Sequence, residues 1–256
     1  LAKALRHAAD SVALDARLRS AFFTRRAELR ELRATGAREA IELHGTAESL
    51  DPNAHGSTMA VRRLLASEER WRELIEDLEV ESDDDAPDMV ARTALRISRV
   101  QSERLGLRDE AIASLLRAAR AVPHDLLVLE ELERLQTEAG DDESLIKTVA
   151  ARVAATPRRN RPPLLVRLAK RKRALGRIAD ALVDLAAALE SDASYEPAWR
   201  EAAEILAENG KHKQLVGLYV TVADAAHFPA MQADAHIQAA RVLDRDLGDV
   251  EAAVEH

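Results

Sequence analysis

Apolar residues recur at helical spacing along most of the chain, in short segments separated by glycine or proline. The clearest example is residues 95–123, where one such segment ends at Gly106 and the next ends at Pro123. In the second segment Ala111, Leu115 and Ala118 lie four and three residues apart, so they share one face of a helix. This pattern predicts two helices joined by a tight glycine turn, the second of which ends before proline.

The same unit repeats along the rest of the chain. Its turn glycines are 34, 36, 34 and 38 residues apart: Gly106, Gly140, Gly176, Gly210 and Gly248. The fifth residue after each glycine is apolar: Ala111, Leu145, Ala181, Leu215 and Ala253. The prolines that close or follow the units are Pro123, Pro157, Pro197 and Pro229. A repeat of this length predicts stacked helix pairs, none of which buries its apolar face alone.

The N-terminal part follows the scheme less cleanly. Ala66 stands where a turn glycine is expected, and Trp71 follows it at the first packing position. The interval from Ala66 to Gly106 is 40 residues and includes the polar segment Asp83–Asp85, which we interpret as an inserted loop. We expect this to be the most irregular junction of the array, with a kink.

The pattern therefore predicts two continuous parts, irregular helical repeats over residues 1–86 and more regular repeats over residues 87–256, with an incomplete last repeat. The predicted helices lie near residues 1–9, 12–34, 37–50, 53–66, 68–81, 88–105, 108–121, 125–139, 142–155, 162–175, 177–191, 196–209, 212–226, 230–247 and from 249 onward.

Composition agrees with an all-α protein. The 47% of apolar residues are mainly Ala, Leu and Val, and only 3% of residues are aromatic, which favours helices in close contact. The net charge of -8 argues against a general nucleic-acid binder. The chain has no cysteine, so disulfides and thiolate sites are excluded. No apolar run approaches the roughly 20 residues of a membrane span.

The repeat resembles the tetratricopeptide repeat (TPR), a helix–turn–helix unit of 34 residues with a closing proline. The unit from residue 198 to 229 matches best, since Trp199, Ala203, Gly210 and Tyr219 stand at family positions. The resemblance covers nearly the whole chain and implies a right-handed α-α superhelix, or solenoid, of antiparallel helix pairs. It also implies that Trp199 and Tyr219 are core residues. Arg152 departs from the pattern, because a second alanine is usual there.

In this family the first helix of each unit lines an inner groove that binds partners. The resemblance places six basic residues there as candidate partner-binding residues: Arg96, Arg134, Arg167, Lys170, Arg173 and Arg200. One hypothesis is a basic pocket for an acidic peptide or a phosphorylated or carboxylate group. The alternative is a solvated helix face that balances nearby acids such as Asp180 and Asp184. The Lys–Asn clamp by which some members bind a C-terminal carboxylate is not supported, since no asparagine stands at the matching positions.

Enzyme signatures are absent from the sequence, including HExxH, GxSxG and glycine-rich phosphate loops. The eight histidines are scattered without ligand spacing, and His44 occupies an inner helix position where we expect it to be packed. We therefore expect no catalytic residue, no metal site and no cofactor.

These observations favour an interaction scaffold or adaptor, part of a larger protein, that binds a peptide or helix of a protein partner in its groove. One alternative is a regulatory or localising arm of an enzyme or signalling protein whose catalytic domain lies outside this sequence. Another is a self-association module whose ends stack into a homo-oligomer, because residues 250–256 form an unfinished unit. The composition suggests a bacterial protein, cytoplasmic rather than periplasmic.

Overall fold

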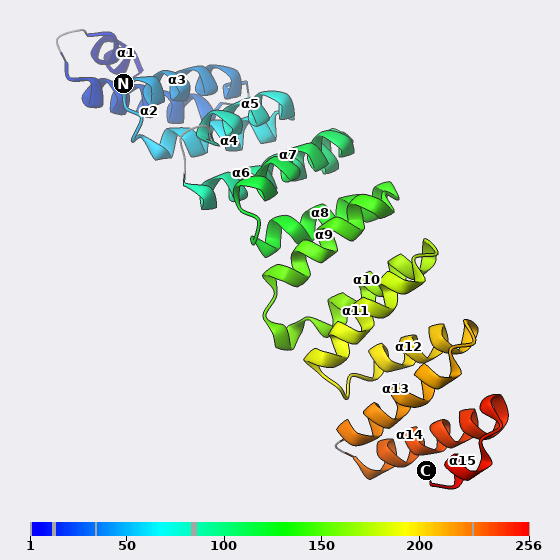
Figure 1. The fold of residues 1–256 in the computed structure, drawn as a ribbon. Helices are drawn as coiled ribbons and strands as arrows, with labels where there is room; N and C mark the ends of the chain where they lie inside the picture. The colour runs from blue at the N-terminus through cyan, green and yellow to red at the C-terminus, as the bar shows by residue number, and fades with distance from the viewer. Residues whose placement is uncertain (1, 12–13, 34, 83–85, 227, 256) are drawn as a thin grey trace. The chain divides into compact units, whose positions relative to one another are not determined.

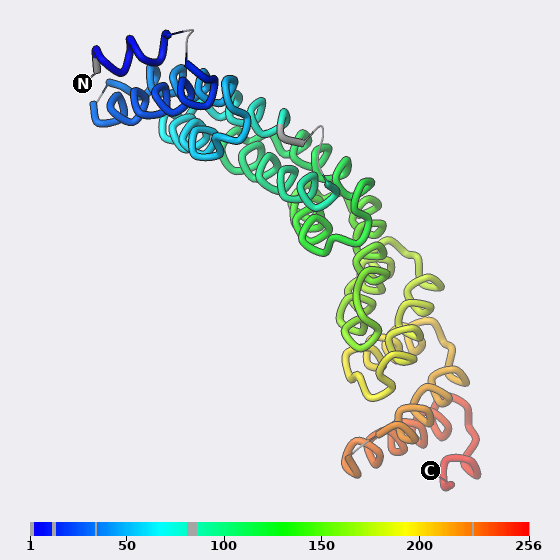
Figure 2. The backbone as a smooth tube through the Cα atoms, turned by 90° about the vertical axis from the view of Figure 1, so that its left-hand side faces the viewer, coloured from blue at the N-terminus to red at the C-terminus, as the bar shows by residue number. Residues whose placement is uncertain are grey.

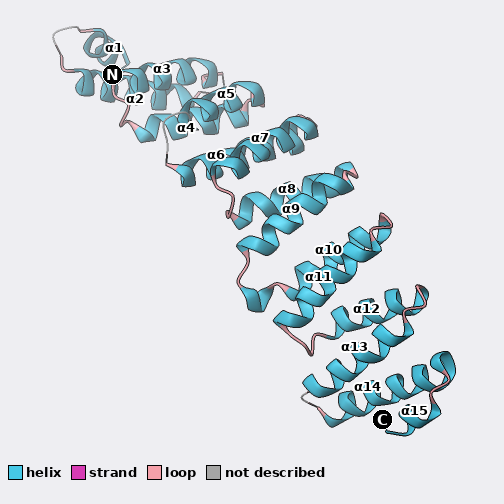
Figure 3. Ribbon diagram, in the orientation of Figure 1, coloured by secondary structure: helices cyan, strands magenta, loops and turns pink. Residues whose placement is uncertain are grey.

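The computed structural model describes residues 2–11, 14–33, 35–82, 86–226 and 228–255 (Figure 1). These residues form helices and turns, with no strand among them (Figure 3). In chain order the α-helices are α1 Ala2–Asp10, α2 Ala16–Glu31, α3 Ala37–Leu50, α4 His55–Ser67, α5 Trp71–Ser82, α6 Pro87–Arg99, α7 Arg108–Ala121, α8 Leu126–Ala139, α9 Asp142–Ala155, α10 Pro162–Ala174, α11 Ile178–Ser191, α12 Glu196–Glu208, α13 His212–Ala225, α14 Pro229–Val242 and α15 Val250–Glu255. Three shorter turns join them: the π-helical η1 Val100–Arg104 and η3 Leu243–Leu247, and the 3-10 helix η2 Arg158–Asn160.

The chain forms two compact units, Leu1–Ala111 and Ile112–His256. Paired helices such as α8 and α9, or α10 and α11, run antiparallel and are joined by short turns, and the tube in Figure 2 follows the same succession of helices (Figures 1 and 2). The predicted all-α array of antiparallel helix pairs is therefore confirmed. The predicted helix ends agree with the observed ones to within four residues when the π-helical turns η1 and η3 are counted with α6 and α14. The predicted difference in regularity between residues 1–86 and 87–256 is a separate property and stays a prediction.

The turn glycines have the backbone conformation that the repeat predicts. All five have positive φ, between 64° and 74°. At the end of α8, Gly140 has φ 73°, and the following N–H, of Asp141, donates to the carbonyl of Gln136 at 3.2 Å. This hydrogen bond satisfies a carbonyl of the last helical turn, which has no partner within the helix. The bond forms only when the residue at position 140 has positive φ, which glycine adopts without strain.

The longest glycine interval has a structural cause. Helix α14 continues into the π-helical turn η3, so this first helix extends over 229–247 before Gly248. A π-helical turn holds more residues than an α-helical turn and accommodates an insertion inside a helix. A π-helical turn, η1, likewise extends α6 before Gly106.

The turn between α4 and α5 corrects one prediction. Ala66 is not the turn residue, because α4 continues through Ser67 and the positive φ, 56°, falls on Glu69. The fifth and ninth residues after Glu69 are Leu74 and Leu78, which are 7% and 1% exposed. Counting from Glu69, the interval to Gly106 is 37 residues, within the range of the other units. Ala66 was therefore wrongly assigned as the turn residue, whereas the expected kink at this junction stays a prediction, and the segment Asp83–Asp85 lies outside the described residues.

Trp71 was also assigned wrongly as the first packing residue, which is Leu74. Its ring is half-buried against the cluster that contains Leu65, Leu74 and Leu78, and the guanidinium of Arg104 lies 5.3 Å from its ring centroid. Trp71 therefore covers the edge of this core.

We expect Glu69→Gly to stabilise the first unit by about 0.5–1 kcal/mol, because a left-handed conformation strains every residue with a Cβ. The measurement is the denaturant midpoint followed by Trp71 fluorescence. The matched control is Glu68→Gly, one residue earlier at φ -91°, where glycine relieves no strain. An equal gain at both positions, or no gain at 69, would contradict the assignment of the turn.

A polar network crosses the core of the first unit. His44 of α3 is 1% exposed, as predicted, and its two ring nitrogens contact Ser57 Oγ at 3.3 Å and Glu31 Oε1 at 2.9 Å. Arg63 of α4 donates to the other oxygen of Glu31 at 2.5 Å, and Thr24 contacts Ser57 Oγ at 2.9 Å. The network thus joins α2, α3 and α4, and its buried polar groups are hydrogen-bonded.

This network predicts a pH dependence. Burial alone raises the pKa of Glu31, but the hydrogen bonds from Arg63 and His44 outweigh it, so the pKa lies below its ordinary value of 4.5. A lowered folded-state pKa contributes stability above pH 4.5 that is lost as the pH falls through the folded value. Denaturant midpoints of the first unit, read from Trp71 at pH 7 and at pH 4 and below, should show this loss, and Glu31→Gln should reduce it. An identical pH slope in the variant would contradict the assignment.

Candidate partner-binding groove of the second unit

Five of the six predicted groove residues lie on first helices of the second unit. Arg134 is on α8; Arg167, Lys170 and Arg173 are on α10; and Arg200 is on α12. Arg96, on α6, belongs to the first unit, where it is exposed. The structure thus brings together the residues of α10 and relates them to their neighbours on α8 and α12.

The three basic residues of α10 pair with carboxylates of the adjacent first helices. Arg173 contacts three glutamates of α12, Glu201 at 2.6 Å, Glu204 at 3.2 Å and Glu208 at 2.7 Å. Lys170 contacts Glu201 at 3.5 Å, and Glu201 is buried. These contacts hold α10 and α12 together across the groove.

On the other side of α10, Arg167 pairs with Glu133 of α8. Arg152 of α9 pairs with Glu133 and Glu130, and its side chain is only 13% exposed. The residue that departs from the repeat pattern therefore fills its position with an ion pair in place of a small side chain.

The remaining candidates pair within their own helices. Arg134 contacts Glu131 and Glu138, each at 2.5 Å, and Arg200 contacts Glu196 at 2.6 Å. An acidic partner at any of these five positions would have to replace a carboxylate of the chain itself. The surface that carries these candidate residues is accordingly mixed in charge.

The solvated-face alternative proposed that Asp180 and Asp184 balance the basic candidates. Both aspartates instead pair with residues that are not among the six candidates. Arg177 contacts Asp180 at 2.9 Å, and Lys172 contacts Asp184 at 2.6 Å. The Lys172 and Asp184 side chains are only 14% and 11% exposed. Burial raises the pKa of Asp184, and the hydrogen bond from Lys172 only partly opposes it. Lys172 thus joins α10 to α11, whereas Lys170 and Arg173 join α10 to α12.

A hollow of about 530 Å³ lies between α12, α13 and α14. Trp199 and Tyr219 line it, packed edge to face with ring centroids 6.3 Å apart. Trp199 is 7% exposed, as predicted for a core residue. Its indole N–H is buried and has no hydrogen-bond partner among the described residues. The same side chain therefore supports the core and lines the hollow.

Charged and polar side chains form the rest of the lining. Arg200 and Glu204 come from α12, and Asp234 and Gln238 from α14, with Ala203 and Ala207 between them. The guanidinium of Arg200 lies 5.5 Å from the centroid of the Trp199 ring. Burial raises the pKa of the Tyr219 hydroxyl, and the Asp234 carboxylate acts in the same direction. The hollow thus combines an aromatic wall with side chains of both charges.

The sequence identified Arg200 as a groove candidate and placed Glu204 near the same surface, but it did not identify Ala207, Asp234 or Gln238. The signal was present, since Glu204 and Ala207 follow Arg200 by four and seven residues on one helix face. The hollow itself depends on how the Trp199 and Tyr219 rings pack, which spacing does not give.

The described residues lack two features that would bear on the site. No group of His, Asp and Glu side chains there could hold a metal ion. No helix there is long and apolar enough to cross a membrane.

No protein-family model matches the chain, and no curated protein matches it. Among solved structures it is similar to YrrB, a TPR protein with an unusual peptide-binding site, at 16% identity over 79% of this chain and 99% of YrrB, with a TM-score of 0.39. It is similar to the C-terminal part of a TPR repeat-containing protein from Cytophaga hutchinsonii at 14% identity over 92% of this chain and 93% of that one, with a TM-score of 0.44. A third similar structure, Naa15/Naa10 bound to HypK-THB, is 14% identical over 98% of this chain and 38% of that one, with a TM-score of 0.51. At such identities the likeness concerns the fold alone.

The repeat length, the helix order and the left-handed turn residues define the chain as a TPR-type helical array. This is the class of protein that the sequence predicted.

Proposed function

We propose that the chain is an interaction scaffold that binds a peptide or helix of a protein partner in the groove of its second unit. The hollow beside Trp199 is the anchor point. The observation that favours it is the combination of an aromatic wall with a rim of charged side chains of both signs. Aromatic and arginine side chains are the types that contribute most to binding at protein interfaces. The proposal assigns no catalytic step to this chain.

The lining indicates the chemistry of the partner. Its volume of about 530 Å³ suits one or two side chains rather than a whole helix. Asp234 favours a cation at one side of the anchor, and Arg200 at the other side can bind a carboxylate of the partner in exchange for Glu196. We therefore propose a partner segment with an apolar anchor residue flanked by charges of both signs. A uniformly acidic segment is disfavoured, because the basic residues of α10 already contact Glu133 and Glu201.

A photo-crosslinking amino acid at position 207 tests this proposal. Ala207 is exposed and lines the hollow, so we expect the partner to be cross-linked there. The control position is 183 on the second helix α11, where Val183 is 68% exposed and lies outside the groove set. Cross-linking at both positions alike would overturn the proposal. A cross-linked species of twice the chain mass from position 207 would instead identify a second copy as the occupant and favour the self-association module.

A further inference from the structure

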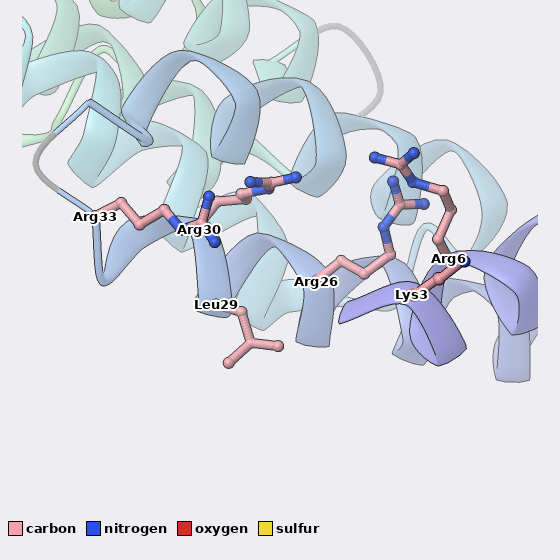
Figure 4. Close-up of a pocket in the computed structure, with 6 residues that line it drawn as sticks. All are labelled: Lys3, Arg6, Arg26, Leu29, Arg30 and Arg33. Atoms are coloured by element: carbon pink, nitrogen blue, oxygen red, sulfur yellow. The ribbon is translucent and has the colours of Figure 1, made fainter. Parts of the chain in front are cut away.

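A second hollow, of about 300 Å³, lies in the first unit between α1, the C-terminal half of α2 and the turn that follows α2. Six residues line it: Lys3, Arg6, Arg26, Leu29, Arg30 and Arg33. Figure 4 shows that the basic side chains come from both helices, that the ends of Arg6 and Arg26 point toward one another, and that Leu29 points away. Five cations and no carboxylate line this α1–α2 basic pocket.

The charge around the pocket departs from the rest of the chain. Residues 1–38 include nine Lys or Arg and only four Asp or Glu, whereas the whole chain has a net charge of -8. Cations gathered at short range repel one another unless anions balance them. The excess of positive charge is therefore confined to this part of the chain, and an anion bound there would reduce the repulsion.

The carboxylates of the chain balance only part of this charge. Arg30 contacts Glu39 at 2.9 Å, and Arg26 contacts Asp10 at 3.7 Å, where the aspartate is 59% exposed. Lys3, Arg6 and Arg33 have no ion-pair partner among the described residues. Three cations of the pocket thus remain available to an external anion.

Two of the guanidinium groups are held in place before any ligand arrives. The side chains of Arg26 and Arg30 are only 13% and 24% exposed. The guanidinium of Arg26 lies 5.3 Å from the centroid of the Phe23 ring, which restricts it further. Restricting donors in advance lowers the entropy that binding costs.

We propose that the α1–α2 basic pocket binds a small anion with two or more phosphate groups. Arginine donors fit phosphate oxygens in pairs, and several phosphates are needed to match the three unbalanced cations. The volume is at the lower end of ligand-binding pockets, so the pocket suits a diphosphate group rather than a protein segment. This site is independent of the groove of the second unit. A nucleoside diphosphate and an inositol polyphosphate share the required chemistry.

Calorimetric titration at fixed ionic strength tests the proposal with inorganic phosphate, pyrophosphate, ADP and inositol hexakisphosphate. We expect pyrophosphate to bind at least about tenfold more tightly than monophosphate, since each further charge-assisted pair adds affinity. Tighter binding of ADP than of pyrophosphate would assign a nucleotide as the ligand, and tightest binding of the inositol compound would assign that class. Equal affinity for monophosphate and pyrophosphate, or no binding by any of the four, would overturn the proposal.

The variant Arg6→Gln/Arg33→Gln removes two exposed cations of the pocket and should weaken pyrophosphate binding about tenfold or more. The matched control is Arg17→Gln/Arg25→Gln, which removes two exposed cations of α2 outside the pocket and should change the affinity less than about twofold. Circular dichroism and Trp71 emission show that both variants are folded. Equal weakening by the two variants would indicate that pyrophosphate is attracted by the overall positive charge of residues 1–38 rather than bound in the pocket, and it would overturn the proposal.

Discussion

Ala181→Leu should destabilise the second unit by about 3 kcal/mol, because it forces a larger side chain into a close helix contact. Ala181 is fully buried in α11 and packs in one core cluster with Leu165, Val166 and Ala169 of α10. The interior is packed too densely to take three more carbon atoms without moving a helix. The measurement is denaturant unfolding followed by Trp199 fluorescence in a Trp71→Phe background, which leaves Trp199 as the only tryptophan.

The control for this prediction is Ala186→Leu, on the same helix at an exposed position, which should change stability by less than about 0.5 kcal/mol. A comparable loss in both variants would show that helix composition rather than packing is responsible. No loss at 181 would show that α10 and α11 do not meet there.

Lys172→Met should destabilise the second unit by roughly 2–3 kcal/mol, because it leaves the carboxylate of Asp184 buried without its cation. The double variant Lys172→Met/Asp184→Leu should recover most of this loss, since an apolar pair of similar volume replaces a buried ion pair at little cost. The pKa of Asp184 is already raised by burial, so the folded state of the single variant takes up a proton more readily than the unfolded state. Its stability deficit should therefore shrink as the pH falls.

Denaturant unfolding of the single and double variants, followed by Trp199 fluorescence at pH 7 and pH 5, measures the loss of stability, its recovery in the double variant and its dependence on pH. Lys147→Met, at an exposed position of α9, is the control and should be nearly neutral. A double variant as unstable as the single one would show that the loss comes from packing of the lysine stem rather than from the unpaired carboxylate.

The fold was predictable because its turns and contacts need particular residue types. Gly140 and Gly176 mark turns at positive φ, and Ala181 and Ala188 mark positions where helices meet closely. Each requirement concerns one position of the repeat, so glycine and alanine recur in the sequence at the repeat interval. The turn at Glu69 was missed because a glutamate, rather than a glycine, occupies the left-handed position, and a glutamate in the sequence does not indicate a turn.

The candidate site was only partly predictable. The sequence placed Arg167, Lys170 and Arg173 on one helix face, but ion pairs between separate helices depend on how those helices stack. Arg173 reaches Glu201, 28 residues further along the chain, although other carboxylates are closer in sequence. The same limit applies to the α1–α2 basic pocket, whose residues are individually unremarkable and gather only when α1 packs on α2.

The central claim is that a partner is anchored in the hollow beside Trp199. The most direct measurement is the affinity of the partner captured at position 207 for two variants, Ala207→Arg, which fills the hollow, and Val183→Arg, which adds the same side chain to α11. We expect a loss of at least about tenfold for Ala207→Arg and less than about twofold for Val183→Arg, with helicity unchanged in both. Full affinity in the Ala207→Arg variant would contradict this claim.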